Sequence, residues 1–305
     1  MMASLARRIV SAILLIGGFL LTLYVLPSAV GVCILVGLSV LGLAEFYGIL
    51  KQAGIPAFNV LGPAAGATLL AASYVSLNSG ALGLGSQPVW GDVPWMVLTA
   101  VVLMVCVRQF PQKNNPQPLP TIACTMMGIM YVPFLLLFVL FLAFRWEPVS
   151  WSAPVGATAR CLVLYLIVVV KASDVGAYFV GSTLGRHKMF PRISPGKTWE
   201  GLAGGLATGL LSSVAFFWFC RQPGAGVVSL GALKIGAGHA WALGACLAAI
   251  GVVGDLVESL LKRSAGLKDS GRLLPGMGGI LDVLDSLLFA SPVLYFYLRC
   301  AAAHP

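Results

Sequence analysis

Acidic residues gather in the second half of the chain, in stretches that are otherwise apolar. Seven of the ten lie between positions 174 and 285. Two of them, Asp282 and Asp285, stand near the start of the run GGILDVLDSLLFASPVLYFYLR, three residues apart and therefore on one helix face. A carboxylate at the centre of a membrane helix costs about 2.5–3.5 kcal/mol on the insertion scale. Ligating a cation would lower that cost, so the two aspartates are expected to have a function.

The segment over residues 254–286 adds further acids and basic residues. A polar stripe there follows the i, i+3, i+4, i+7 spacing of one helix face: Asp255, Glu258, Ser259 and Lys262. If the last two helices pack side by side, these acids meet the two aspartates, and convergent carboxylates bind a hard divalent ion through oxygen. We expect a Mg²⁺ site, with a second cation left open, whose ligands are Asp255, Asp282, Asp285 and Glu258. Structural salt bridges such as Glu258 with Lys262 are the alternative, but they leave most of the acids unexplained.

A second polar segment lies at residues 171–205. Lys171 and Asp174 are spaced to pair on one helix face. The basic loop after them offers hydroxyl and ammonium donors suited to phosphate oxygens: Ser194, Lys197 and Thr198. A P-loop is excluded, because Pro191 stands where that motif needs glycine and no soluble α/β core surrounds it. A metal beside a basic, serine-bearing loop is what phosphoryl or nucleotidyl transfer requires.

The elements that must position these residues are transmembrane helices. The chain of 305 residues is 59% hydrophobic and 10% charged, with a mean hydropathy of +0.94, whereas a soluble domain carries roughly 25% charged residues. A helix needs about 20 apolar residues to cross the bilayer. We therefore predict an all-α, polytopic transmembrane helix bundle of about nine spans, near residues 8–28, 30–50, 58–78, 93–108, 120–144, 160–183, 200–220, 237–261 and 278–299.

Basic residues orient this bundle by the positive-inside rule. With the N-terminus in the cytoplasm, thirteen of the nineteen Lys and Arg residues fall on the cytoplasmic side and five outside. We expect a cytoplasmic N-terminus, an N-terminal scaffold of about five spans over residues 1–150, and a C-terminal catalytic region over residues 151–305 whose site faces the cytoplasm. The net charge of +9 is explained by topology and anionic lipid rather than by nucleic acid.

Both polar segments carry long motifs with regular spacing. The first reads D-x-G-A-Y-x-x-G at residues 174–181 and S-P-x-K-T-W-E-G at residues 194–201. The second, S-x-x-K-R-x4-K-D-x5-P-G-x-G-G-x-x-D-x-x-D, comprises Ser259, Lys262, Arg263, Lys268, Asp269, Pro275, Gly276, Gly278, Gly279, Asp282 and Asp285. These blocks resemble the phosphatidate cytidylyltransferase (CDP-diacylglycerol synthase) family. Met277 stands where that family's signature has histidine, and Val283 where it has arginine.

The resemblance implies an enzyme that transfers the cytidylyl group of CTP to phosphatidic acid, giving CDP-diacylglycerol and pyrophosphate in phospholipid biosynthesis. It implies catalytic roles for Asp255, Asp282, Lys262, Lys268 and Asp269. It implies substrate-binding roles for Ser194, Lys197, Thr198, Glu200, Ser259, Arg263 and Asp174. The lysines and the arginine would hold the triphosphate or the lipid phosphate, and Asp269 would orient the lysines.

Other classes of protein stay open at this point. A CTP-dependent polyprenol or lipid kinase would release CDP, a transporter would use the buried carboxylates as an ion relay, and an inactive scaffold would keep only the fold. We expect an integral protein of the bacterial inner membrane. Its expected partners are CTP, phosphatidic acid and membrane lipid, with no nucleic acid and with a homodimer left open.

Overall fold

The computed structural model of the chain describes residues 2–80, 91–112, 115–147, 152–220, 227–230, 233–271, 273 and 278–303. The chain forms two compact units. The first unit comprises Met1–Leu140, Pro148–Val155 and Ser264–Val283, and the second comprises Phe141–Glu147, Gly156–Arg263 and Leu284–Pro305.

The first unit is built of apolar helices, some of which begin or end next to proline or glycine. They are α1 (Met2–Tyr24), α2 (Ser28–Gln52), α3 (Leu61–Leu77), α4 (Val93–Val107), α5 (Pro118–Tyr131) and most of α6 (Pro133–Phe144). α2 begins directly after Pro27, and Gly54 follows its end with a φ of 72°, a conformation that commonly terminates helices. α5 gives way to α6 at Val132, because Pro133 has no N–H with which to continue the helical hydrogen bonds.

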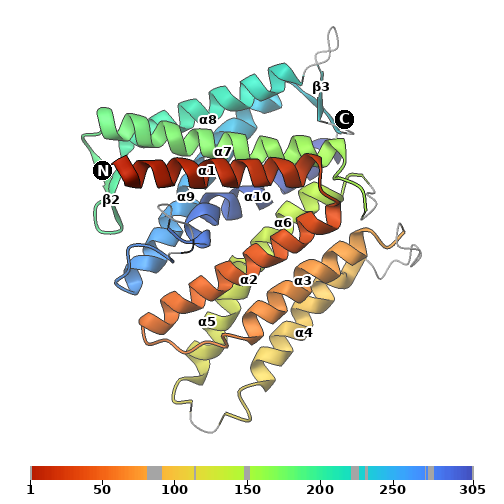
Figure 1. The fold of residues 1–305 in the computed structure, drawn as a ribbon, viewed down its shortest axis with the longest axis vertical. Coiled ribbons are helices and arrows are strands. Elements are labelled where there is room, and N and C mark those ends of the chain that lie inside the picture. The colour runs from red at the N-terminus through yellow and green to blue at the C-terminus, as the bar shows by residue number, and fades with distance from the viewer. Residues whose placement is uncertain are drawn as a thin grey trace. The chain divides into compact units, whose positions relative to one another are not determined.

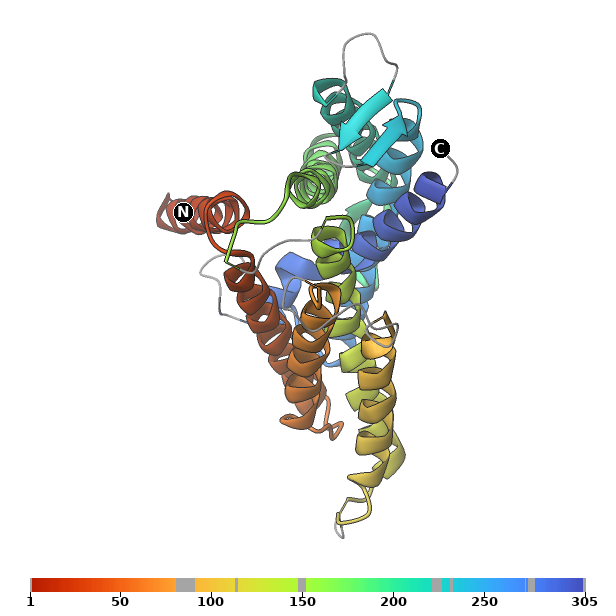
Figure 2. The same cartoon turned by 90° about the vertical axis from the view of Figure 1, so that its right-hand side faces the viewer.

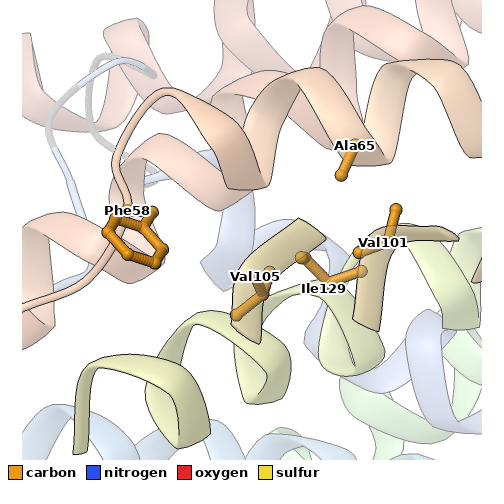
Figure 3. Close-up of a cluster of buried hydrophobic side chains, with 5 residues drawn as sticks. All are labelled: Phe58, Ala65, Val101, Val105 and Ile129. Carbon is orange, nitrogen blue, oxygen red and sulfur yellow. The ribbon is translucent and has the colours of Figure 1, made fainter. Parts of the chain in front are cut away.

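A small apolar cluster joins three helices of this unit, as Figure 3 shows. Its members come from α3, α4, α5 and the turn before α3: Phe58, Ala65, Val101, Val105 and Ile129. Two buried hydroxyl groups beside it, those of Tyr47 and Thr125, are hydrogen-bonded. The Tyr47 hydroxyl donates to the Thr125 carbonyl at 2.9 Å, and the Thr125 hydroxyl accepts from the Phe58 N–H at 3.0 Å. Because an unpaired buried polar group is costly, the first bond fixes α2 against α5 and the second fixes the turn before α3 against α5.

The second unit holds the other helices and four short strands. Its helices are α7 (Ala157–Thr183), α8 (Trp199–Phe219), and most of α9 (His239–Ser264) and α10 (Ile280–Ala303). Its strands are β1 (Lys188–Phe190), β2 (Ser194–Thr198), β3 (Val227–Leu230) and β4 (Leu233–Gly236). β1 pairs with β2 and β3 with β4, both antiparallel, and Figure 2 shows the second pair side by side. The prediction of an all-α chain missed both hairpins. For the β1–β2 hairpin the reason is that the basic run over residues 188–198 has no alternating apolar pattern.

α7 and α8 run side by side in Figure 1 and touch along small residues. A Cβ at Gly176 of α7 would overlap the Thr208 side chain of α8, and a Cβ at Gly204 would overlap Val180. The Thr208 hydroxyl also donates to the Ala172 carbonyl at 3.1 Å. Glycine at these positions therefore lets the two helices approach closely, as is common between helices in membranes.

Six helical segments are long and apolar enough to cross a membrane, by length and composition, when α5 and α6 are taken together. They are Ser28–Gln52, Pro118–Phe144, Ala157–Thr183, Trp199–Phe219, His239–Ser264 and Ile280–Ala301. Three shorter apolar helices accompany them, at Ile13–Tyr24, Leu61–Leu77 and Val93–Val107. Large apolar side chains such as Leu14, Leu103 and Phe219 are more than half exposed, as lipid-facing positions would be. A helical membrane protein is thus confirmed, whereas nine spans and their orientation stay predictions.

Candidate active site

Three carboxylates of the second unit meet between α9 and α10. One carboxylate oxygen from each of Asp255, Glu258 and Asp285 lies within 4.8 Å of the other two. Glu258 and Asp285 are buried, and Asp255 is half-buried. The prediction that Asp255 meets an acid of the last helix is therefore confirmed for Asp285. We refer to these three residues as the carboxylate cluster.

Gly254 allows α10 to approach α9 at this cluster. A Cβ at Gly254 would overlap the backbone carbonyl of Asp285, which cannot yield without a shift of α10. One turn earlier, a Cβ at Gly251 would make only ordinary contacts, 3.6 Å from Val170 and 3.7 Å from Ser286. Gly254 is thus the glycine that sets the separation of the two helices where their carboxylates meet.

Two lysines offset the charge of the carboxylate cluster. Lys197 Nζ lies 2.9 Å from Asp255 Oδ2 and also donates to the Val252 carbonyl at 3.3 Å. Lys262 Nζ lies 2.5 Å from Glu258 Oε2, one turn along α9, so the salt bridge that the sequence offered as the alternative to a metal ligand is present. Charges that are buried together need such pairing to offset their desolvation. Among the ion pairs of the described residues none includes Asp285, so the cluster has one more acid than it has lysines.

A further ion pair lies beside the cluster on α7. Lys171 Nζ is 3.0 Å from Asp174 Oδ2, as the spacing of the two residues predicts. Ser286 of α10 connects this pair to the cluster, because its hydroxyl lies 3.4 Å from Asp174 Oδ2 and 3.0 Å from Asp285 Oδ1. Sequence reasoning missed Ser286, although its place directly after the last aspartate of the motif is a signal that could have revealed it.

The β1–β2 hairpin carries Lys197 to the cluster and is held by its neighbours. The Thr198 hydroxyl is buried and accepts from the Gly201 N–H at 3.1 Å, so it caps α8. The Glu200 carboxylate accepts from the His187 N–H at 3.2 Å and lies 2.6 Å from the His187 ring Nδ1. These contacts hold both ends of the hairpin. Direct substrate contacts of Thr198 and Glu200 therefore stay predictions.

Other predicted site residues lie along the same hairpin and helix. Arg263 Nε donates to the Ile193 carbonyl at 3.2 Å, which ties the end of α9 to the turn between β1 and β2. The Ser259 hydroxyl donates to Asp255 Oδ1 at 3.3 Å, and Ser194 begins β2 and is half-buried. The second unit therefore brings together most of the residues that the two sequence motifs identified.

Three predicted catalytic residues belong to the first unit instead. Lys268 and Asp269 are exposed on the segment between α9 and α10. Asp282 Oδ2, in the first turn of α10, accepts from the Gly279 N–H at 2.7 Å and from the Ser270 N–H at 3.1 Å. Asp282 as a metal ligand, and Lys268 and Asp269 as catalytic residues, stay predictions.

The structure describes one of the two positions at which this chain departs from the family signature. Met277, Pro275 and Gly276 lie outside the described residues. Val283, where the resemblance implies an arginine, is half-buried in α10.

The carboxylate cluster has the chemistry of a site for a hard divalent cation. Its donors are all carboxylate oxygens, which such ions prefer. Three carboxylates this close repel one another in a poorly solvated site. A bound cation would neutralise the charge of Asp285, the acid that neither lysine pairs with. The residues present therefore fit a divalent metal ion.

Together, these features define a helical integral membrane protein with a polar, acid- and lysine-lined centre among its C-terminal helices. The sequence model of the cytidylyltransferase family matches residues 6–301. The chain belongs to that family.

Curated relatives agree over a shorter stretch. The chain is 44% identical over 137 residues to a phosphatidate cytidylyltransferase of Haemophilus influenzae, which is 45% of each chain. It is 44% identical over 136 residues to the phosphatidate cytidylyltransferase of Bacillus subtilis, covering 45% of this chain and 46% of that one. It is 40% identical over 138 residues to the uncharacterized protein YnbB of Escherichia coli, covering 45% and 42%. The matched part thus spans a little under half the length of these relatives.

Proposed function

We propose that the protein transfers the cytidylyl group of CTP to phosphatidic acid and releases CDP-diacylglycerol and pyrophosphate. Membership of the cytidylyltransferase family and the names of two bacterial relatives support this reaction. In the proposed step, an oxygen of the lipid phosphate attacks the α-phosphorus of CTP. The bond from that phosphorus to the oxygen bridging to the β-phosphate breaks, and its electrons leave with pyrophosphate.

The observation that carries the proposal is the contact between Lys197 and Asp255. It joins the S-P-G-K-T hairpin, which has the donors for phosphate, to the carboxylate cluster, which has the ligands for a cation. Phosphoryl chemistry depends on positioning and charge neutralisation, and this arrangement provides both within one unit. A structural ion pair alone would not need a hairpin of this sequence beside three acids.

Some residues of the site would bind the phosphates, and others would orient the residues that bind them. Lys197, Lys262 and Arg263 would hold phosphate oxygens, and Lys268 would join them. Ser194 and Ser259 would donate hydroxyl hydrogens, while Asp174 would keep Lys171 oriented. Thr198 and Glu200 would hold the hairpin and, through it, the substrate. A phosphate monoester is already anionic near neutral pH, so the proposed attack needs no strong general base.

A divalent metal ion, which we take to be Mg²⁺, would neutralise charge on the phosphates when bound. Asp255, Glu258 and Asp285 would hold it. We add Asp282 as a fourth ligand because it precedes Asp285 by three residues on one helix. A second cation stays a prediction.

The proposed site faces the cytoplasm, where CTP is made, in a chain of nine spans with a cytoplasmic N-terminus. The distribution of lysine and arginine supports this orientation. The names of bacterial relatives support placement in a bacterial inner membrane. A homodimer stays a prediction.

The test is turnover by the purified, detergent-solubilised protein with labelled CTP, phosphatidic acid and Mg²⁺, scored for the lipid nucleotide and pyrophosphate together. The proposal expects both products in equal amounts. CDP with a phosphorylated lipid would indicate the lipid kinase, and absence of both products from protein that binds CTP would contradict the proposal. Neither kinase nor transporter is favoured by the family match.

A further inference from the structure

Glu45 is a buried acid on a helix that is otherwise almost entirely apolar. It lies in α2, in the stretch GLAEFYGIL, and is only 8% exposed. No other acidic residue occurs before position 92. Sequence reasoning placed Glu45 in the scaffold and gave it no role. A buried carboxylate on a membrane helix needs partners, and its partners identify what it does.

Its carboxylate caps the start of α10, a helix more than 230 residues further along the chain. Glu45 Oε1 accepts from the Ile280 N–H at 3.0 Å, and Oε2 accepts from the Leu281 N–H at 2.9 Å. The first N–H groups of a helix have no partner within it, and a side chain directly before the helix usually accepts from them. Gly279 occupies that position and has no side chain. Glu45 supplies the acceptor from another helix, and its charge suits a helix N-terminus.

The same carboxylate shares a partner with Asp282. Asp282 Oδ2 accepts from the Gly279 N–H at 2.7 Å, which is the backward bond of a capping box. The Ser270 hydroxyl lies 2.8 Å from Asp282 Oδ2 and 3.0 Å from Glu45 Oε2. A hydroxyl has one hydrogen to donate, so the two carboxylates are coupled through Ser270.

The position of the Glu45 carboxylate explains why residues 271 and 279 are glycines. A Cβ at Gly279 would overlap the Glu45 carboxylate and the Ser270 hydroxyl, and a Cβ at Gly271 would overlap the Glu45 carboxylate. The chain therefore closes tightly around Glu45 on both sides, which leaves little freedom for the first turn of α10.

We propose that Glu45 is a positioning residue that holds the first turn of α10 and Ser270, and through them the carboxylate of Asp282. The inference rests on the proposed function, in which Asp282 is a metal ligand. Glu45 acts through other groups and is not itself assigned to substrate or metal. Residues that orient a metal ligand typically change metal affinity or activity by about 10–100-fold when they are replaced.

The test compares Glu45→Gln with the wild-type full chain in detergent. The amide has the same shape but only one acceptor oxygen, so one of the two backbone N–H groups loses its partner. We expect the dissociation constant for Mn²⁺, a paramagnetic substitute for Mg²⁺, to rise about 10-fold in an electron paramagnetic resonance titration. The Mg²⁺ concentration that gives half-maximal turnover is expected to rise by a similar factor.

Tyr47→Phe is the matched control, because it removes one buried hydrogen bond of the same helix, the one to the Thr125 carbonyl of α5. It is expected to lower the unfolding temperature and to leave the Mn²⁺ dissociation constant unchanged. Equal constants for Glu45→Gln and the wild type would overturn the positioning role. If Glu45→Gln does not fold, Ser270→Ala replaces it, since it removes only the shared hydroxyl. A wild-type constant in Ser270→Ala would then overturn the role.

The outcome separates this inference from the function on which it rests. An active, Mn²⁺-binding wild type with an unaltered Glu45→Gln variant contradicts only the positioning role. A wild type that neither binds Mn²⁺ nor forms CDP-diacylglycerol contradicts the function and the inference together.

Discussion

Lys197 connects the β1–β2 hairpin to the carboxylate cluster. Its ammonium group pairs with Asp255 and also donates to a backbone carbonyl of α9, and its side chain is about one-fifth exposed. A lysine held at the rim of a carboxylate cluster is a compact positive charge with several hydrogens to donate.

Replacing Lys197 by methionine is therefore expected to lower kcat by about 100-fold, the scale seen when one preorganised electrostatic group is lost. The measurement is steady-state turnover with CTP and phosphatidic acid. Lys188→Met is the matched control, because Lys188 lies exposed on β1 of the same hairpin. Equal losses in both variants would show that the overall charge of the hairpin matters and not the contact with Asp255.

Asp285 is the acid of the cluster that accepts hydrogen bonds from Ser286 and that forms no ion pair with a lysine of the described residues. Asp285→Asn keeps the shape and removes the charge, so metal binding should weaken while folding is retained. We expect the rise in unfolding temperature that saturating Mg²⁺ produces in the wild type to be mostly lost, because a ligand stabilises only the state that binds it. Asp92→Asn, on an exposed residue before α4, should retain the full rise. A full Mg²⁺ effect in Asp285→Asn would remove this residue from the metal site.

At the scale of elements, the site depends on how closely helices can approach. α9 and α10 meet where Gly254 lies against the Asp285 carbonyl, and α7 and α8 meet where glycines leave room for Thr208 and Val180. Small residues at such contacts let membrane helices pack by van der Waals contact, since lipid offers them no hydrophobic driving force.

Gly254→Ala should separate α9 from α10 and disturb the carboxylate cluster. The added methyl group meets backbone, so we expect a loss of about 1–3 kcal/mol in the free energy of unfolding, as for other overpacked sites. We also expect reduced turnover in the protein that remains folded. Gly251→Ala adds the same methyl group one turn away, where it would make only ordinary van der Waals contacts. It should change the free energy of unfolding and the turnover little. Thermal unfolding and turnover in detergent measure them, and equal behaviour of the two variants would contradict the role of Gly254.

At the scale of the whole molecule, the number of spans decides which side of the membrane each end occupies. Six long apolar helices and three shorter ones are present in the described residues. If all nine cross, an odd number of crossings puts the two ends on opposite sides. The surplus of basic residues then favours a cytoplasmic N-terminus.

Reporter fusions in a bacterial host test this arrangement. A fluorescent protein that folds only in the cytoplasm should be bright at the N-terminus and dark at the C-terminus, and alkaline phosphatase at the C-terminus should be active. Both ends reporting the same side would contradict nine spans. A bright C-terminus with a dark N-terminus would retain the odd number and reverse the orientation.

The sequence by itself determined the class of this protein and indicated candidate residues for its site. Hydropathy over some 20 residues reports a membrane helix wherever it occurs, so helices were correctly expected in these stretches. The spacing of three between Lys171 and Asp174 is local on a helix, so this ion pair could be predicted. The spacing of four between Glu258 and Lys262 is equally local, so their salt bridge could be named as the alternative to metal binding. The motifs also indicated the family, to which the chain belongs.

Only the tertiary structure decided which distant groups meet. Lys197 reaches Asp255 because a hairpin forms, and no local periodicity in the basic loop predicts that hairpin. Glu45 and the first turn of α10 are joined across more than 230 residues, and the Ser286 hydroxyl of α10 lies 3.4 Å from Asp174 Oδ2 of α7. Such contacts depend on how packed helices satisfy buried polar groups and fill space around small residues. Those requirements act between elements, so they leave no regular pattern within any one of them.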